Sequence, residues 1–346
     1  MSLWKFVLRL CVGILLVACL LYKHGVQAQE ILNRMLELPV PVLLGALLMN
    51  LLGQALSAYR WGQLSALAGR PVEFRRLLEL YFSGMFFNMC LPTSIGGDVV
   101  RVVGMSRKTG SKSAALASVF MDRNVGLSAL LVVGTVAALL WPTVSIQATY
   151  PPGSPQPIIV PLWPLFLLLC CGYVLANIVL FSDQFCNLVT ALISRVRLGI
   201  VGQKIARLHS AVQEYRMPWT RYLWTFALSV VYQASEIALI WLLARGLHID
   251  VSPLVFCALV PFQAVACLLP ITFNGIGVRE GIFCAVLMGQ LGHGVKDEAL
   301  ALSLIYLLGV VMISSLLGGL VYVLSGIQRP SLAEAEGVAG SATAGE

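Results

Sequence analysis

Apolar stretches of helical length recur along this chain of 346 residues, and they constrain its fold more than any other feature. A bilayer core is crossed by an α-helix of roughly 20 apolar residues. Only 11% of the residues are Asp, Glu, Lys or Arg, whereas a soluble domain carries about 25%. The sequence therefore predicts an all-α, polytopic integral membrane helix bundle and excludes a water-soluble or disordered protein. Six stretches predict full spans: 4–22, 39–59, 114–140, 158–181, 221–244 and 299–325.

Three further apolar stretches are shorter or broken, and whether they cross the membrane decides the topology. Residues 77–90 end in LPTSIGGD, and residues 252–270 and 276–292 flank LPITFNGIG. Lys and Arg in short loops stay on the cytoplasmic side. If the amino terminus lies inside and 77–106 enters and leaves by one face, most of the 23 basic residues are cytoplasmic. A full crossing by the first stretch would place most of them outside. We therefore expect a re-entrant hairpin, cytoplasmic amino and carboxyl termini, and location in the cell inner (cytoplasmic) membrane.

The two interrupted motifs echo each other. LPTSIGGDVVR at 91–101 is matched by LPITFNGIGVRE at 269–280, and in each motif Pro and Gly break an apolar helix just before a charged residue. In this topology the first hairpin enters from the cytoplasm and the second from outside. Opposed broken helices are typical of an inverted repeat whose halves meet near the midplane and line a site. We expect two re-entrant hairpins, although two full crossings by 252–292 would leave the sidedness unchanged.

The remaining segments suggest one membrane domain. Residues 1–326 form a single transmembrane domain, followed by a disordered cytoplasmic tail at 327–346. Residues 183–215 place apolar side chains at helical spacing opposite basic ones, which predicts an amphipathic segment on the inner leaflet; the alternative is a solvated loop. The uncharged, proline-rich stretch 141–157 predicts an extended external loop.

Charged side chains at membrane depth cost about 3 kcal/mol each on insertion scales, so they point to function. Asp98 and Arg101 follow Gly96 and Gly97 directly. The free amides of a helix beginning there could bind an anionic headgroup, and Arg101 adds a phosphate donor. The alternative is that Asp98 only caps the helix and Arg101 reaches toward the inner surface.

The second motif carries the mirror arrangement, with Arg279 and Glu280 after Gly275 and Gly277. Adjacent helical residues do not face each other, so one of the two side chains could line the cavity. The alternative is a purely structural ion pair.

Two other positions are charged within predicted spans. Asp122 and Arg123 begin a long span within DRNVGL, where bracing of the first hairpin is one reading and a role in the site the other. Glu236 lies in the middle of the 221–244 span with no cation within a helical turn. It must face the bundle interior, find a distant arginine or carry a proton. A cavity-lining or proton-carrying role and a buried, hydrogen-bonded carboxyl both remain open.

Several kinds of chemistry find no support in the sequence. No GxxxxGK[ST] phosphate loop is present, so ATP hydrolysis is not expected. The nine Cys form no CxxC pair and the four His are far apart, so we expect neither a metal nor a cofactor. Too few His and carboxylates cluster for acid–base work, which argues against an enzyme.

LPTSIGGDVVRV, DRNVGL and LPITFNGIGVREG together resemble the flippase-like transmembrane family (UPF0104-type), whose best known members form the membrane half of lysylphosphatidylglycerol synthases. The resemblance covers nearly all of residues 1–326, without the aminoacyl-transferase domain of the lysyl-lipid enzymes, so we do not expect this chain to make an aminoacyl lipid itself. It implies a bundle that moves or binds polar lipids, and stand-alone relatives are associated with envelope glycolipid pathways. At matching positions it implies these site residues: Gly96, Gly97, Asp98, Arg101, Asp122, Arg123, Gly275, Gly277, Arg279 and Glu280.

The expected function is therefore that of a lipid flippase-like protein. Its partners would be membrane lipids, either an anionic phospholipid or a polyprenyl-phosphate glycolipid, taken across the cytoplasmic membrane through a polar cavity. Two alternatives remain: a secondary transporter of a small solute, and a non-transporting membrane partner of an envelope glycosyltransferase.

Overall fold

The computed structural model describes most of the chain. The described residues are 15, 28–66, 71–90, 96–148, 158–195, 206, 209, 210, 213, 218–269 and 272–325, without the side chains of 192, 194, 195, 273 and 293. Apart from residue 15, the predicted first span lies outside them, as do the tip of the first motif at 91–95 and the tail.

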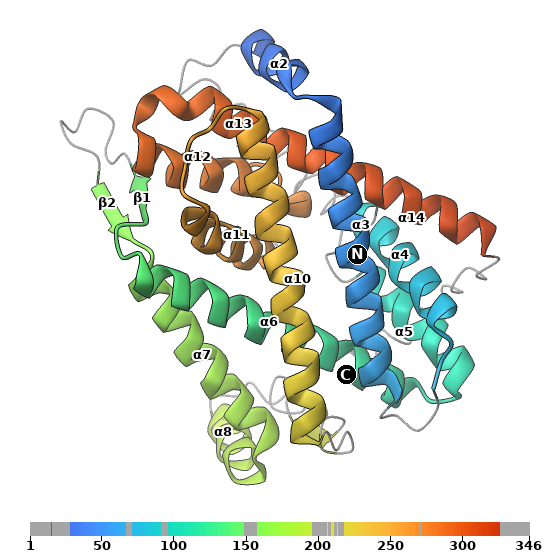
Figure 1. Ribbon diagram of the computed structural model, residues 1–346. Coiled ribbons are helices and arrows are strands. Elements are labelled where there is room, and N and C mark those ends of the chain that lie inside the picture. Colours follow the sequence, from blue (N-terminus) through green and yellow to red (C-terminus); the bar gives the residue numbers. More distant parts are fainter. Residues whose placement is uncertain are drawn as a thin grey trace.

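The described part of the chain is mostly helical, and five of its helices are long and apolar enough to cross a membrane (Figure 1). They confirm a multi-pass membrane protein and five of the six predicted spans. The last of them is continuous through three segments: α13 (Lys296–Ile305), a π-helical stretch η4 (Tyr306–Met312) and α14 (Ile313–Leu324). The others are α3 (Val40–Ser65), α6 (Lys112–Leu140), α7 (Trp163–Phe181) and α10 (Trp219–Gly246).

The three shorter apolar stretches form two pairs of helices. The first pair is α4 (Phe74–Cys90) and α5 (Gly96–Thr109), and the second is α11 (Pro253–Leu268) and α12 (Val278–Leu291), joined through η2 (Phe273–Gly275). At 1.5 Å per residue these helices are about 21–25 Å long, less than a bilayer core of about 30 Å. Return of each pair to the leaflet it entered stays a prediction.

Glycines allow the first pair to pack closely. A methyl group added at Gly97 of α5 would overlap the backbone carbonyl of Gly84 in α4, and one added at Gly318 of α14 would overlap the carbonyl of Phe82. Small residues at such contacts let helix backbones approach each other in a membrane. Helix α4 is therefore held between α5 and α14.

Loops that the topology places on one side do lie together. Arg34 of α2 (Ala28–Glu37) contacts Glu298 at the start of α13, with Nη2 and Oε1 3.3 Å apart. Gln290 of α12 donates to the carbonyl oxygen of Thr143 at 3.0 Å, beside the antiparallel strands β1 (Ser145–Ala148) and β2 (Ile158–Pro161). The 3₁₀ turn η3 (His293–Val295) lies between α12 and α13.

The opposite end of the bundle carries α8 (Asp183–Arg195), the described start of the predicted amphipathic segment (Figure 1). The extended external loop was expected at 141–157. Of this stretch, β1 is extended, and residues 149–157 lie outside the described part. Which end faces the cytoplasm stays a prediction.

Candidate functional site

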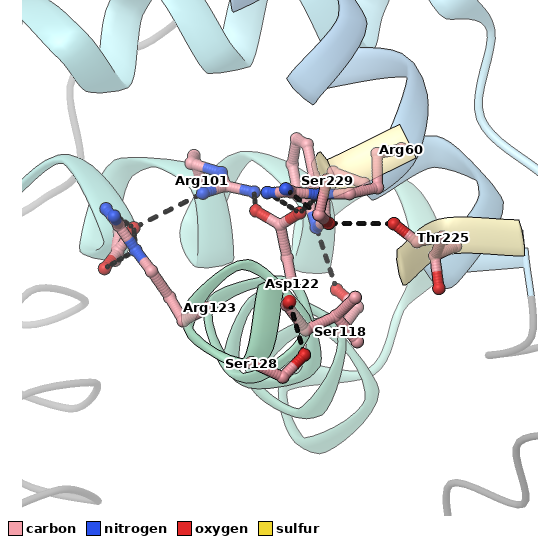
Figure 2. Close-up of polar contacts among 11 residues, drawn as sticks. Arg60, Arg101, Ser118, Asp122, Arg123, Ser128, Thr225 and Ser229 are labelled. Atoms are coloured by element: carbon pink, nitrogen blue, oxygen red, sulfur yellow. Dashed lines mark hydrogen bonds and ion pairs between the residues drawn. The ribbon is translucent and has the colours of Figure 1, made fainter. Parts of the chain in front are cut away.

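A network of hydrogen bonds around one buried carboxylate joins four helices inside the bundle (Figure 2). Asp122 of α6 accepts from Arg60 of α3, with Nη2 and Oδ1 2.8 Å apart, and from Arg101 of α5, with Nη2 and Oδ2 2.7 Å apart. Arg60 also donates to Ser229 of α10 at 2.9 Å. All three charged side chains are buried. Together with Asp98 and Arg123 they form what we call the arginine cluster.

Arg101 has several further contacts. Its Nη1 lies 3.4 Å from Asp98, and its guanidinium lies over the rings of Trp61 and Tyr81, 4.2 and 4.6 Å from their centroids. Such stacking is favourable for a desolvated cation. Arg101 is not among the residues that line either of the two cavities described below. The expectation that it faces a cavity is therefore not met in this conformation, where Arg101 links α5 to α6.

The rest of the first motif is also occupied by protein partners. Arg123 donates to both carboxylate oxygens of Asp98 at 2.9–3.1 Å, which fits the expected bracing of the hairpin by α6. The amide of Gly97, expected to face a headgroup, donates to the side chain of Asn88 at 2.8 Å. Gly96 and Gly97 are buried. Half of the Arg123 side chain remains exposed, so Arg123 is the accessible arginine of the cluster.

One cavity among the described residues adjoins the arginine cluster, and we call it the arginine cavity. Its volume is about 250 Å³, and α3, α4, α6, α10, α11 and η4 line it. The charged lining residues are Arg60, Asp122, Arg123 and Glu236. Apolar residues, among them Leu127 and Leu268, complete the wall.

Glu236 faces the bundle interior, which is one of the three outcomes that the sequence leaves open. Its Oε2 accepts from the hydroxyl of Tyr306 at 3.0 Å. Its Oε1 is buried and has no hydrogen-bond partner among the described residues. The carboxyl thus lines the arginine cavity with one oxygen uncommitted.

The second cavity lies between α4 and the second motif, and we call it the asparagine cavity. It measures about 200 Å³ and is lined by Asn88 and Met89 of α4, by Asn274 and Arg279 of the second pair, and by Tyr306. Asn274 Nδ2 donates to the Met89 sulfur at 3.0 Å. This contact places the end of α4 beside the second motif, whereas the meeting of the two broken segments near the midplane stays a prediction.

Arg279 and Glu280 point apart. Arg279 donates from Nη2 to the carbonyl of Asn274 at 3.3 Å, lies 5.6 Å from the centroid of the Tyr306 ring, and has buried Nε and Nη1 without partners in the described part. Glu280 accepts from the amide of Gly277 and from Ser303. Their contacts therefore match the expected division of roles and differ from an ion pair between the two.

The backbone of the second motif requires its glycines. Asn274, Gly275 and Gly277 have φ of 51°, 74° and 87°. These values lie in the left-handed region, which glycine adopts without a steric penalty and asparagine adopts more readily than most residues. Gly275 and Gly277 thus set the turn that brings Arg279 into the asparagine cavity.

Sequence reasoning missed several polar lining residues, among them Arg60, Asn88, Asn274 and Tyr306. Arg60 was counted with the cytoplasmic loop because the predicted span ended at residue 59, but α3 continues to Ser65. A usable signal was present, since Asn50, Ser57 and Arg60 fall on one helical face. Among the described residues, no group of three or more His, Cys, Asp or Glu could hold a metal ion.

Comparisons with known proteins agree on one family. The family described as the lysylphosphatidylglycerol synthase TM region matches residues 6–318. A UPF0104 membrane protein of Pyrococcus horikoshii is 30% identical over 122 residues. That alignment covers 34% of this chain and 36% of the relative, so the chain spans about a third of the curated relative it matches.

Proposed function

Because the chain belongs to the lysylphosphatidylglycerol synthase transmembrane-region family, we propose that it binds an anionic, phosphate-bearing lipid or polyprenyl-linked glycolipid between its helices and translocates it across the cytoplasmic membrane. Family membership supports a role with membrane lipids. The transport step, the direction and the lipid class belong to the proposal.

The amphipathic character of the arginine cavity carries the proposal. Arg123, with half of its side chain exposed, lines this cavity together with the partly exposed Leu127 and the 53% exposed Leu268. Burying an unpaired phosphate charge in hydrocarbon costs on the order of tens of kcal/mol by the idealised estimate. A wall with guanidinium groups offsets that cost for a headgroup, while apolar side chains at the rim suit the acyl or prenyl tails.

The asparagine cavity offers a second position for the headgroup. Tyr306 lines both cavities, and Arg279 supplies two buried guanidinium nitrogens that lack a partner among the described residues. An anionic oxygen is the natural acceptor for such donors. In the proposed mechanism the headgroup passes from one cavity to the other as the re-entrant pairs, arranged as an inverted repeat, move against the rest of the bundle.

Flipping by the purified chain in proteoliposomes tests the proposal. The probe is phosphatidylglycerol labelled on its headgroup, and the variants are Arg123→Gln and Arg279→Gln. Each removes charge-assisted hydrogen bonds worth about 1.5–3 kcal/mol, so we expect roughly 10- to 150-fold slower flipping.

Arg245→Gln is the matched control, because Arg245 forms an exposed ion pair with Asp250 outside both cavities. Labelled lipid that stays in its leaflet with the unmodified chain, or flipping that both cavity variants leave at the control rate, would refute the proposal.

A further inference from the structure

The charged side chains of the arginine cluster and of the two cavity linings, taken with Glu280, balance each other only when Glu236 is ionised. The arginine cluster by itself holds three guanidinium groups and two carboxylates, so it carries one positive charge in excess. Arg279 and Glu280 add one charge of each sign and leave that excess unchanged. The set is Arg60, Arg101, Arg123 and Arg279 against Asp98, Asp122, Glu236 and Glu280. The partly buried Arg76 and Glu79 of α4 pair with each other and line neither cavity.

Of the four carboxylates in this set, Glu236 has the fewest hydrogen-bond and ion-pair partners among the described residues. Asp98 and Asp122 each have an arginine within 2.7–2.9 Å, and Glu280 accepts from a backbone amide and a hydroxyl. Glu236 accepts one hydrogen bond from Tyr306, and no arginine or lysine lies within 4.0 Å of it in the described part. A carboxylate between two arginines is held ionised by them, whereas Glu236 is free of that constraint.

The groups that share the arginine cavity with Glu236 come from every helix around it. Helix α11 contributes the uncharged Gln263, and the hydroxyl of Tyr306 makes the direct contact. The guanidinium of Arg279 lies over the Tyr306 ring, 5.6 Å from its centroid. The titratable or charged groups on the wall are Arg60 of α3, Tyr81 of α4, Asp122 and Arg123 of α6, Tyr232 of α10 and Tyr306 of η4.

We propose that Glu236 takes up a proton when an anionic headgroup enters the arginine cavity, so that the anion and one proton occupy the site together. This inference rests on the proposed function. A phosphodiester brings one negative charge, and with Glu236 ionised the set would then carry one negative charge in excess. Unbalanced charge is costly away from water. Conversion of the carboxylate to the neutral acid by one proton restores the balance, and no other reactant is needed.

The geometry of the carboxyl suits this exchange. Oε2 keeps its hydrogen bond from Tyr306 in either form, because a protonated carboxyl still accepts at its carbonyl oxygen. Oε1, which has no partner among the described residues, would carry the proton. Its new O–H can donate to an oxygen of the headgroup, so the one uncommitted atom gains a partner only when both proton and anion are present.

Binding of phosphatidylglycerol to the full-length purified chain, measured between pH 5 and 8, tests the inference. Uptake of one proton on binding requires the affinity to fall as pH rises, by up to tenfold per pH unit. We expect Glu236→Gln to bind with the affinity of the unmodified chain at low pH and without this pH dependence. Glu30→Gln, at an exposed position of α2, is the matched control and should keep the full dependence.

Calorimetry of the unmodified chain in two buffers of different ionisation enthalpy gives the proton count directly and does not depend on the variant folding. About one proton taken up per lipid supports the inference, and none overturns it. An equal pH dependence in Glu236→Gln and the unmodified chain also overturns it while leaving the proposed function standing. Absence of phosphatidylglycerol binding at every pH overturns both.

Discussion

Replacement of Asp122 by Asn tests how much the buried carboxylate stabilises the bundle. The change keeps the shape of the side chain but leaves the guanidinium groups of Arg60 and Arg101 without their shared counter-ion. Breaking a buried pair by removing one partner costs about 3–5 kcal/mol. The lower end applies here, because Arg101 keeps Asp98 at 3.4 Å and Arg60 keeps Ser229 at 2.9 Å.

The expected loss can be expressed as a change in melting temperature. At about 2.1 cal/mol/K per residue, a chain of 346 residues has an unfolding entropy of roughly 0.7 kcal/mol/K. A loss of about 3 kcal/mol then lowers the midpoint by about 4 °C. Spans that stay helical in the micelle gain less entropy on unfolding, so the shift should be at least this large. Intrinsic tryptophan fluorescence of the detergent-purified protein during heating gives the measurement.

Asp250→Asn is the matched control for this experiment. Asp250 and Arg245 are also 2.7 Å apart, but both side chains are more than half exposed. Exposed pairs contribute about 0–1 kcal/mol, so we expect a shift of about 1 °C or less. Similar shifts for the two variants would refute the argument from burial. So would a double variant, Arg60→Gln with Asp122→Asn, whose shift equals the sum of the two single shifts, because groups in one network are coupled.

Two further predictions concern the packing of α5 against α4 and the hydrogen bond between Tyr306 and Glu236. Gly97→Ala should sharply reduce the yield of monodisperse protein, because the added methyl group overlaps a backbone carbonyl of α4. Gly172→Ala is the control, since Gly172 has open space around it, and it should be neutral or stabilise the protein by up to about 1 kcal/mol. Equal yields of the two variants would contradict the close approach of α4 and α5. Tyr306→Phe removes the hydrogen bond to Glu236 and keeps the ring, and it should cost about 1–3 kcal/mol in the same thermal assay, so an unchanged midpoint would argue against that bond.

The helices were predictable from the sequence because their signals are local. The length of the apolar stretches predicted five of the spans. The Pro and Gly residues predicted both interruptions, which follow directly after the ends of α4 and α11. These features depend on helix propensity and on the thickness of the bilayer, which act on each segment separately.

The pairing of charged residues was not predictable in the same way. Asp122 and Arg101 were identified singly, but which arginine lines a cavity depends on how α3, α5 and α6 pack. Arg60 looked like a loop residue, and its position shows that the positive-inside rule does not locate the end of a helix. Tyr306 resembled an ordinary residue of an apolar run, and its role follows only from the contact with Glu236.

The π-helical stretch Tyr306–Met312 has a mechanical consequence. A segment with i→i+5 pairing that reverts to i→i+4 pairing changes the helical phase of everything after it by one residue, which is a turn of about 100° and a rise of about 1.5 Å. Everything after it is α14, whose Gly318 and Gly319 face Phe82 and Phe86 of α4. Ser315 of α14 lines the asparagine cavity, so one screw motion along this helix would displace a wall of that cavity and the contact with α4 together.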